Sequence, residues 1–65
     1  MTLPNAPVER IIRNAGAERV SKEAVEELKQ AVEELGEEIA LDASKLADHA
    51  DRNTNKKEDI TLATQ

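Results

Sequence analysis

The side chains best suited to binding chemistry are cations and hydroxyls in two separate stretches of the chain. Arg10 and Arg13 are three residues apart, a spacing that puts both on one face of a helix, and Arg19 follows them. Thr54 and Lys56 stand farther along, in the polar turn HADRNTNKKEDI at residues 49–60. Proteins contact phosphate with lysine, arginine, hydroxyls and exposed backbone N–H groups. The five residues therefore predict a phosphate-binding surface, and the alternative is that they are ordinary solvated groups.

The acidic residues lie in a different part of the chain from these cations. Residues 21–51 hold ten Asp and Glu against three Lys, a net charge of −7. Residues 1–20 and residues 52–65 each carry +1, and the whole chain carries −5. The acidity therefore lies almost wholly on the central stretch, and the cations are left to the stretches on either side of it.

The composition excludes several classes of function. The 65 residues include no Cys, one His (His49) and no aromatic residue, which excludes disulfides, thiolate metal sites and base stacking on aromatic rings. No Ser/His/Asp set, Cys/His set or phosphate-binding glycine loop is present, so we expect no enzyme, cofactor, metal or small-molecule substrate. No apolar run approaches the roughly 18 residues of a membrane span, and no signal peptide opens the chain, so we expect a soluble cytoplasmic protein.

The apolar residues predict three helices and no strands. A short amphipathic helix carries Val8, Ile11, Ile12 and Ala15 and ends at Gly16. A long helix is predicted from about Ser21, its N-cap, to Ala50. A last short helix begins near Lys56, with Thr54 or Asn55 as its cap, and Asn55 with Glu58 resembles a capping box. The long helix has apolar residues at every third or fourth position: Ala24, Leu28, Ala31, Val32, Leu35, Ile39, Ala43, Leu46, Ala47 and Ala50.

The long helix is too long for the domain that contains it. About 29 residues make a helix of about 43 Å, whereas a compact globule of this size has a diameter of roughly 28 Å. Because the apolar stripe continues to both ends, we expect a second chain to cross the first near its middle. Gly36 would allow close approach of the two backbones there, or it is merely tolerated in the helix. Residues 1–65 then form a single domain that is completed by its partner.

Several blocks of the sequence resemble one family. LPNAPVERIIRNAGAERVS, ELGEEIALDASKLADHADRNTNKKEDI and the short–long–short plan are similar to an archaeal histone, the minimal histone fold, over essentially the whole chain. The most specific pieces are Leu3-Pro4, RIIRNAGAERVS, the pattern KLA.HA.R.T and the EDI ending. The resemblance implies an all-α histone fold that forms an obligate handshake dimer and binds double-stranded DNA with little sequence preference. It also implies that dimers join into tetramers or longer assemblies, and a location on the chromosome in the nucleoid.

The resemblance also implies roles for single residues. It places Arg10, Arg13, Arg19, Thr54 and Lys56 against DNA, with Arg19 suited to a narrow minor groove. Arg52 and Asp59 would form a structural ion pair that braces the second loop, and the alternative is two independent surface charges. Leu46, His49 and Asp59 would form the contact between dimers, whereas a lone His at a helix end is otherwise a surface residue or a partner of the helix dipole.

The acidity of the chain departs from the family pattern, whose members are typically basic. Fewer neutralised phosphates mean weaker and less salt-dependent DNA binding. A second hypothesis therefore stands beside a DNA-binding architectural protein. In it, the chain is an interaction module with weak DNA affinity that forms heterodimers with other histones or caps their assemblies.

Overall fold

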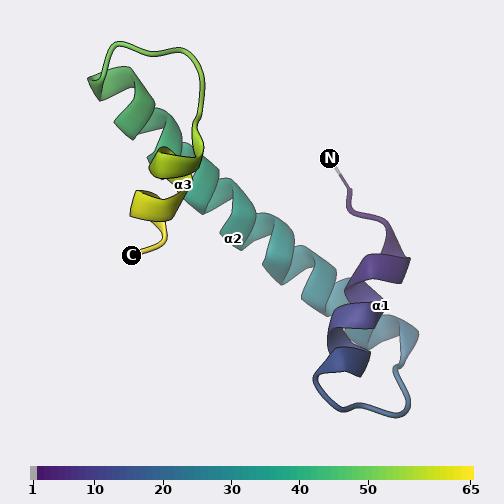
Figure 1. The fold of residues 1–65 in the computed structure, drawn as a ribbon. Coiled ribbons are helices and arrows are strands. Elements are labelled where there is room, and N and C mark those ends of the chain that lie inside the picture. The colour runs from purple at the N-terminus through teal and green to yellow at the C-terminus, as the bar shows by residue number, and fades with distance from the viewer. Residues whose placement is uncertain (1) are drawn as a thin grey trace. The chain divides into compact units, whose positions relative to one another are not determined.

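The computed structural model describes residues 2–65, and within that range it contains three helices and no strands (Figure 1). Helix α1 spans Asn5–Asn14, α2 spans Lys22–His49 and α3 spans Lys57–Ala63. The predicted all-α, short–long–short architecture is confirmed. The residues form two compact units, Met1–Glu34 and Leu35–Gln65, and α2 contributes to both. None of the described helices has the length and apolar character needed to cross a membrane.

Helix α1 begins three residues before its first apolar position and ends where the sequence predicts. Pro4 is the N-cap residue in an extended conformation, and Pro7 lies in the first turn, where helices need no backbone donor. At the other end, the N–H groups of Gly16 and Ala17 donate to the carbonyls of Arg13 and Ile12, at 3.0 and 3.4 Å. This is a Schellman motif, and Gly16 supplies the positive φ, +114°, that it requires.

Helix α2 is continuous over 28 residues and agrees with the predicted range to within one residue at each end. The predicted cap is confirmed, because Ser21 Oγ accepts a hydrogen bond of 3.0 Å from the backbone N–H of Ala24. A second Schellman motif ends the helix. Its positive φ of 59° falls on Asp51, and the N–H of Arg52 donates to the carbonyl of Ala47 at 2.9 Å.

The predicted cap of α3 is wrong. The N-cap residue is Lys56, whose backbone N–H donates to Asp59 Oδ2 at 2.9 Å, so the capping carboxylate comes from Asp59 and not Glu58. Asn55 lies one residue before the N-cap, and its side chain turns to α2, where Nδ2 donates to Ser44 Oγ at 2.9 Å. A contact between elements has replaced the local capping pattern that the sequence suggested.

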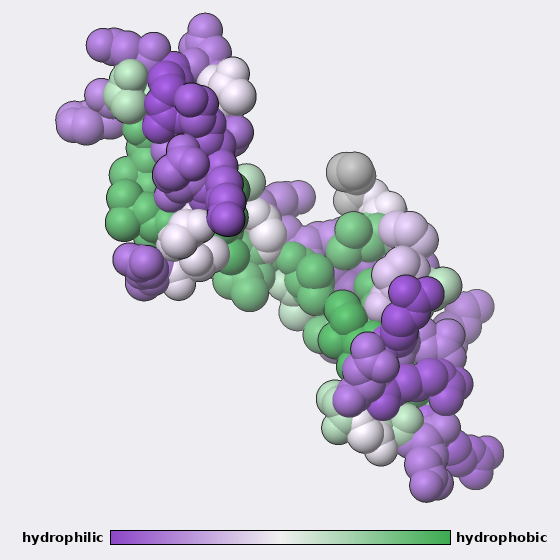
Figure 2. Space-filling model, viewed as in Figure 1, coloured by the Kyte–Doolittle hydropathy of each residue, from purple (hydrophilic) through white to green (hydrophobic). Residues whose placement is uncertain are grey.

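Few side chains are buried within a single chain. The buried apolar residues are Val8 and Val25 in the first unit and Ala43 and Ala47 in the second, together with the carboxylate of Asp59. Figure 2 shows apolar surface open on the visible face of each unit. The large apolar side chains that remain exposed are Ile11, Leu35, Leu41, Ile60 and Leu62.

Candidate nucleic-acid interface

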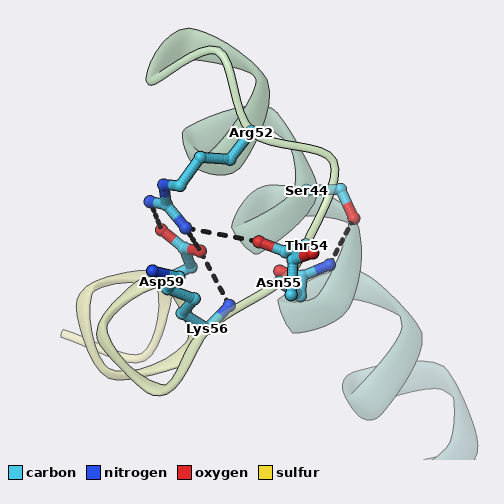
Figure 3. Close-up of polar contacts among 6 residues, drawn as sticks. All are labelled: Ser44, Arg52, Thr54, Asn55, Lys56 and Asp59. Carbon is cyan, nitrogen blue, oxygen red and sulfur yellow. Dashed lines mark hydrogen bonds and ion pairs between the residues drawn. The ribbon is translucent and has the colours of Figure 1, made fainter.

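The loop between α2 and α3 is held by Arg52 and Asp59 (Figure 3). Arg52 Nη1 donates to Asp59 Oδ2 at 2.9 Å, and Nη2 donates to Oδ1 at 2.8 Å, a bidentate ion pair. Arg52 Nη1 also donates to the carbonyl of Thr54 at 3.2 Å. The side chains are 30% and 6% exposed for Arg52 and Asp59, so the pair is shielded from water mainly on its acidic side. Arg52 therefore ties the end of α2, the loop and α3 together.

These contacts change the ionisation of both partners. The hydrogen bonds from Arg52 and from the Lys56 backbone N–H hold the pKa of Asp59 below its ordinary value. The hydrogen bond to Asp59 raises the pKa of Arg52 further, so its guanidinium stays charged. The ion pair is therefore fully formed at neutral pH and is lost only when acid protonates Asp59.

The braced loop leaves two predicted phosphate contacts on the surface. Thr54 uses its backbone carbonyl for Arg52, while its side chain is exposed. Lys56 uses its backbone N–H for Asp59, and its residue is exposed as well. The backbone of both residues is thus fixed from the inside, and a hydroxyl and an ammonium group face solvent.

The other predicted contacts lie on helix α1, which carries Arg10 and Arg13, and in the loop between α1 and α2, which carries Arg19. Arg10 and Arg19 are exposed, and neither makes a hydrogen bond or ion pair to another side chain among residues 2–65. Arg19 borders an open hollow that Ile12, Val20, Ser21 and Ala24 also line. Both guanidinium groups are therefore available to an anionic ligand.

Arg13 differs from these two arginines. Its Nη2 and Nε donate to Glu9 Oε1 at 2.9 and 3.3 Å, and its Nη1 donates to the carbonyl of Glu18 at 3.1 Å. Neither contact was predicted from the sequence. The spacing of four residues between Glu9 and Arg13 is a visible signal for the first contact, but a loop carbonyl leaves no signal in a sequence.

The residues predicted for contacts between dimers lie around the end of α2 and the start of α3. Leu46 is half-buried, and His49, the last residue of α2, is exposed. Asp59 is buried, and both of its carboxylate oxygens already accept hydrogen bonds within the chain. Of the three, the imidazole of His49 is the most accessible to a second molecule.

The described residues hold no group of three or more His, Cys, Asp or Glu side chains arranged to bind a metal ion. What they do provide is cations and hydroxyls on two loops, each held by an arginine at a helix end. The chain has a short helix, a long helix and a second short helix, and an ion pair braces the loop before the second short helix. This arrangement is that of the histone-fold class.

Comparison with known proteins identifies the family of the chain within this fold class. Residues 1–64 match the family model described as histone-like transcription factor (CBF/NF-Y) and archaeal histone. The chain is 48% identical to a subunit of the archaeal histone HAN1 of Thermococcus zilligii over 63 residues, covering 97% of this chain and 94% of that protein. It is also 48% identical to probable archaeal histone 3 of Methanocaldococcus jannaschii over 61 residues, 94% of this chain and 91% of that protein.

The chain belongs to this family of histone-like transcription factors and archaeal histones. The predicted resemblance and histone fold are confirmed. Membership makes the chain a DNA-binding architectural protein of chromatin, of a kind that works as a dimer.

Proposed function

We propose that two chains pair in a handshake and bind double-stranded DNA through their cationic loops, with little preference for base sequence. The observation that carries this proposal is that Arg10, Arg19 and Lys56 are exposed while the backbone around Lys56 is fixed by the Arg52–Asp59 pair. Preorganised cations on a firm backbone suit a ligand with regularly spaced phosphates, since binding then orders few side chains.

The need for a second chain follows from the surface that one chain exposes. Each of the two units leaves large apolar side chains exposed, Ile11 in the first and Leu62 in the second among them. Exposed apolar surface of this kind is typical of a contact with a partner. The exposed Leu35, Leu41 and Ile60 supply apolar surface for that contact. A second copy of the chain is the simplest partner. Dimers would then join at Leu46 and His49, beside the buried Asp59, whose carboxylate holds the loop.

The lack of sequence preference follows from the residue types. Contacts to phosphate position a protein on DNA but carry no sequence information. No aromatic residue is present to stack on a base. Arg19 is suited to a narrow minor groove, where an inserted arginine responds mainly to groove width. We place the protein on the chromosome, in the nucleoid of the cytoplasm.

The test is a gel-shift titration on nonspecific duplex DNA over a series of salt concentrations. Each phosphate contact contributes about 0.9 to the slope of log affinity against log salt. Because a dimer has two copies of each residue, Arg10→Ala, Arg19→Ala and Lys56→Ala should each lower the slope by up to about 2. Lys45→Ala, which removes an exposed cation from the acidic part of α2, is the matched control and should leave the slope nearly unchanged.

A second candidate function is favoured by one observation, the ten acidic residues in residues 21–51. They suit an interaction module that pairs with other, basic histones or caps their assemblies and contributes little DNA affinity of its own. A stable dimer that shifts no DNA even at low salt would support this candidate and reject the first.

A further inference from the structure

Two arginines in the molecule make the same pair of contacts, one in each unit. Arg52 donates to the carboxylate of Asp59 and to the carbonyl of Thr54 in its loop. Arg13 donates to the carboxylate of Glu9 and to the carbonyl of Glu18 in its loop. In both cases a guanidinium joins a helical carboxylate to a loop carbonyl. The parallel indicates that the two arginines have the same task.

We propose that Arg13 is a positioning residue for the first loop rather than a phosphate ligand, and that it acts on DNA through Arg19. The inference rests on the DNA-binding function proposed above. It revises one of the five predicted phosphate contacts, since Arg13 binds the loop while Arg10 and Arg19 face the DNA.

The contacts of Arg13 argue against a direct phosphate contact. Three of its nitrogen atoms, Nε, Nη1 and Nη2, already donate hydrogen bonds within the chain. The Glu9 carboxylate lies 2.9 Å from Nη2 and offsets part of the charge of the guanidinium. A phosphate in its place would have to displace that carboxylate and remain close to it, at an electrostatic cost. Arg10 makes no ion pair of this kind with any of residues 2–65.

The carbonyl of Glu18 links Arg13 to Arg19 directly. The C=O of Glu18 and the N–H of Arg19 belong to one peptide group, which is planar and trans. When Arg13 Nη1 holds that oxygen at 3.1 Å, it fixes the plane of the peptide and so the direction in which the backbone of Arg19 leaves the loop. Losing this hydrogen bond frees the peptide to rotate and spreads the Arg19 side chain over more orientations.

The brace at Arg13 is weaker than the brace at Arg52. The Arg13 and Glu9 side chains are 50% and 41% exposed, so water screens the pair and its contribution to folding stability is small. Positioning by Arg13 should therefore appear in DNA binding and in loop mobility rather than in the thermal stability of the dimer.

The experiment compares Arg13→Lys and Arg13→Gln with the matched pair Arg10→Lys and Arg10→Gln. Lysine keeps the charge that a phosphate needs but lacks the planar fork that reaches two acceptors at once. If Arg13 is a positioning residue, both of its variants weaken DNA binding by a similar factor, about three- to tenfold, and both keep the wild-type salt slope. At Arg10, lysine is tolerated, and glutamine lowers the slope by up to about 2 per dimer.

The opposite pattern at Arg13 overturns the inference: lysine would behave like the wild type, and glutamine would lower the salt slope as it does at Arg10. A second measurement is independent of DNA. Amide hydrogen exchange at residues 17–20 of the free dimer should be faster in both Arg13 variants and unchanged in both Arg10 variants. Unchanged exchange in the Arg13 variants rejects the brace itself. Absence of DNA binding by the wild type rejects the proposed function, and exchange then still decides whether Arg13 holds the loop.

Discussion

The two units connect a short helix to α2 in the same way but with different residues. Each unit joins a short helix to α2 through a loop that begins with a Schellman motif, and a carbonyl of each loop accepts a hydrogen bond from an arginine. The first loop places a glycine, Gly16, at the position of positive φ, whereas the second places Asp51 there. The helix after the first loop is capped by a neutral hydroxyl, and the helix after the second by a carboxylate.

The buried residues of the two units differ in the same direction. The first unit buries two valines, Val8 and Val25, and the second buries two alanines, Ala43 and Ala47, with the carboxylate of Asp59. Alanine removes little apolar surface from water, so packing contributes less in the second unit. Its ion pair is shielded from water on the acidic side, so removing one of the two charges would leave the other without its partner. Sensitivity to acid and to charge substitution is therefore expected to concentrate in the second unit.

The largest effect should come from Asp59→Asn. The substitution removes one partner of the shielded ion pair and leaves Arg52 without its carboxylate, so the dimer should unfold several degrees lower in temperature. Glu9→Gln removes the matched but exposed carboxylate of the first unit and should cost no more than about 0.5 kcal/mol per chain. Thermal unfolding at neutral pH, fixed salt and equal chain concentration measures both. Equal losses in the two variants would show that the difference in burial has no energetic consequence.

The same pair predicts a pH dependence of stability. Folding lowers the pKa of Asp59, so the folded state binds a proton less readily than the unfolded state does. The stabilisation is present above the unfolded pKa, about 3.9, and is lost as the pH falls through the lower folded value. Unfolding followed from about pH 7 to about pH 3 should therefore show a fall in stability that is reduced in Asp59→Asn. An identical acid profile in the variant contradicts the assignment.

The next largest effect is on folding stability when the residue at either position of positive φ is replaced. Its sign differs between the two loops. Gly16→Ala should destabilise the fold by about 1–2 kcal/mol per chain, because alanine disfavours that backbone conformation. No atom lies within 4 Å of where its Cβ would be, so the loss would be backbone strain and not a clash. Asp51→Gly should stabilise the fold by about 1 kcal/mol, since it relieves strain and removes an anion from a helix C-terminus.

A control separates the two contributions at position 51. Asp51→Asn removes the charge but keeps a side chain that tolerates positive φ, so it should gain only the part due to the helix dipole, about 0.5 kcal/mol. Chemical denaturation at equal chain concentration measures all three variants. Destabilisation by Asp51→Gly would mean that the Asp51 carboxylate makes a favourable contact that the strain argument omits.

The sequence predicted the helices well because their signals are local. Apolar spacing located α2 to within a residue at each end, and Ser21 and Gly16 marked a start and a stop. The start of α1 has a weaker local signal, because the predicted apolar positions begin only at Val8, although Pro4 and Pro7 fit a first turn.

The residues that were missed depend on contacts between elements. Asn55 matched a capping pattern, but Ser44, eleven residues earlier, takes its side chain. The Glu18 carbonyl that accepts a hydrogen bond from Arg13 is a backbone group, so no pattern of residue types predicts it. The Arg52–Asp59 pair spans seven residues across a turn, a spacing with no local rule, and it was anticipated only through the family resemblance.

The smallest effects separate the caps of α2 and α3. Ser21→Ala removes the N-cap hydrogen bond of α2 and should lower the free energy of unfolding by about 0.5–1 kcal/mol per chain. Ser21→Asp, which keeps a side-chain acceptor, should retain most of that stability. Asn55→Ala removes only an exposed hydrogen bond to Ser44 and should cost less than about 0.5 kcal/mol. Ser44→Ala should then reproduce the Asn55→Ala value, because both lose the same hydrogen bond. The opposite result would be that Asn55→Ala loses as much stability as Ser21→Ala while Ser44→Ala loses none. Asn55 would then cap α3 in solution, and the Asp59 carboxylate would bind only Arg52.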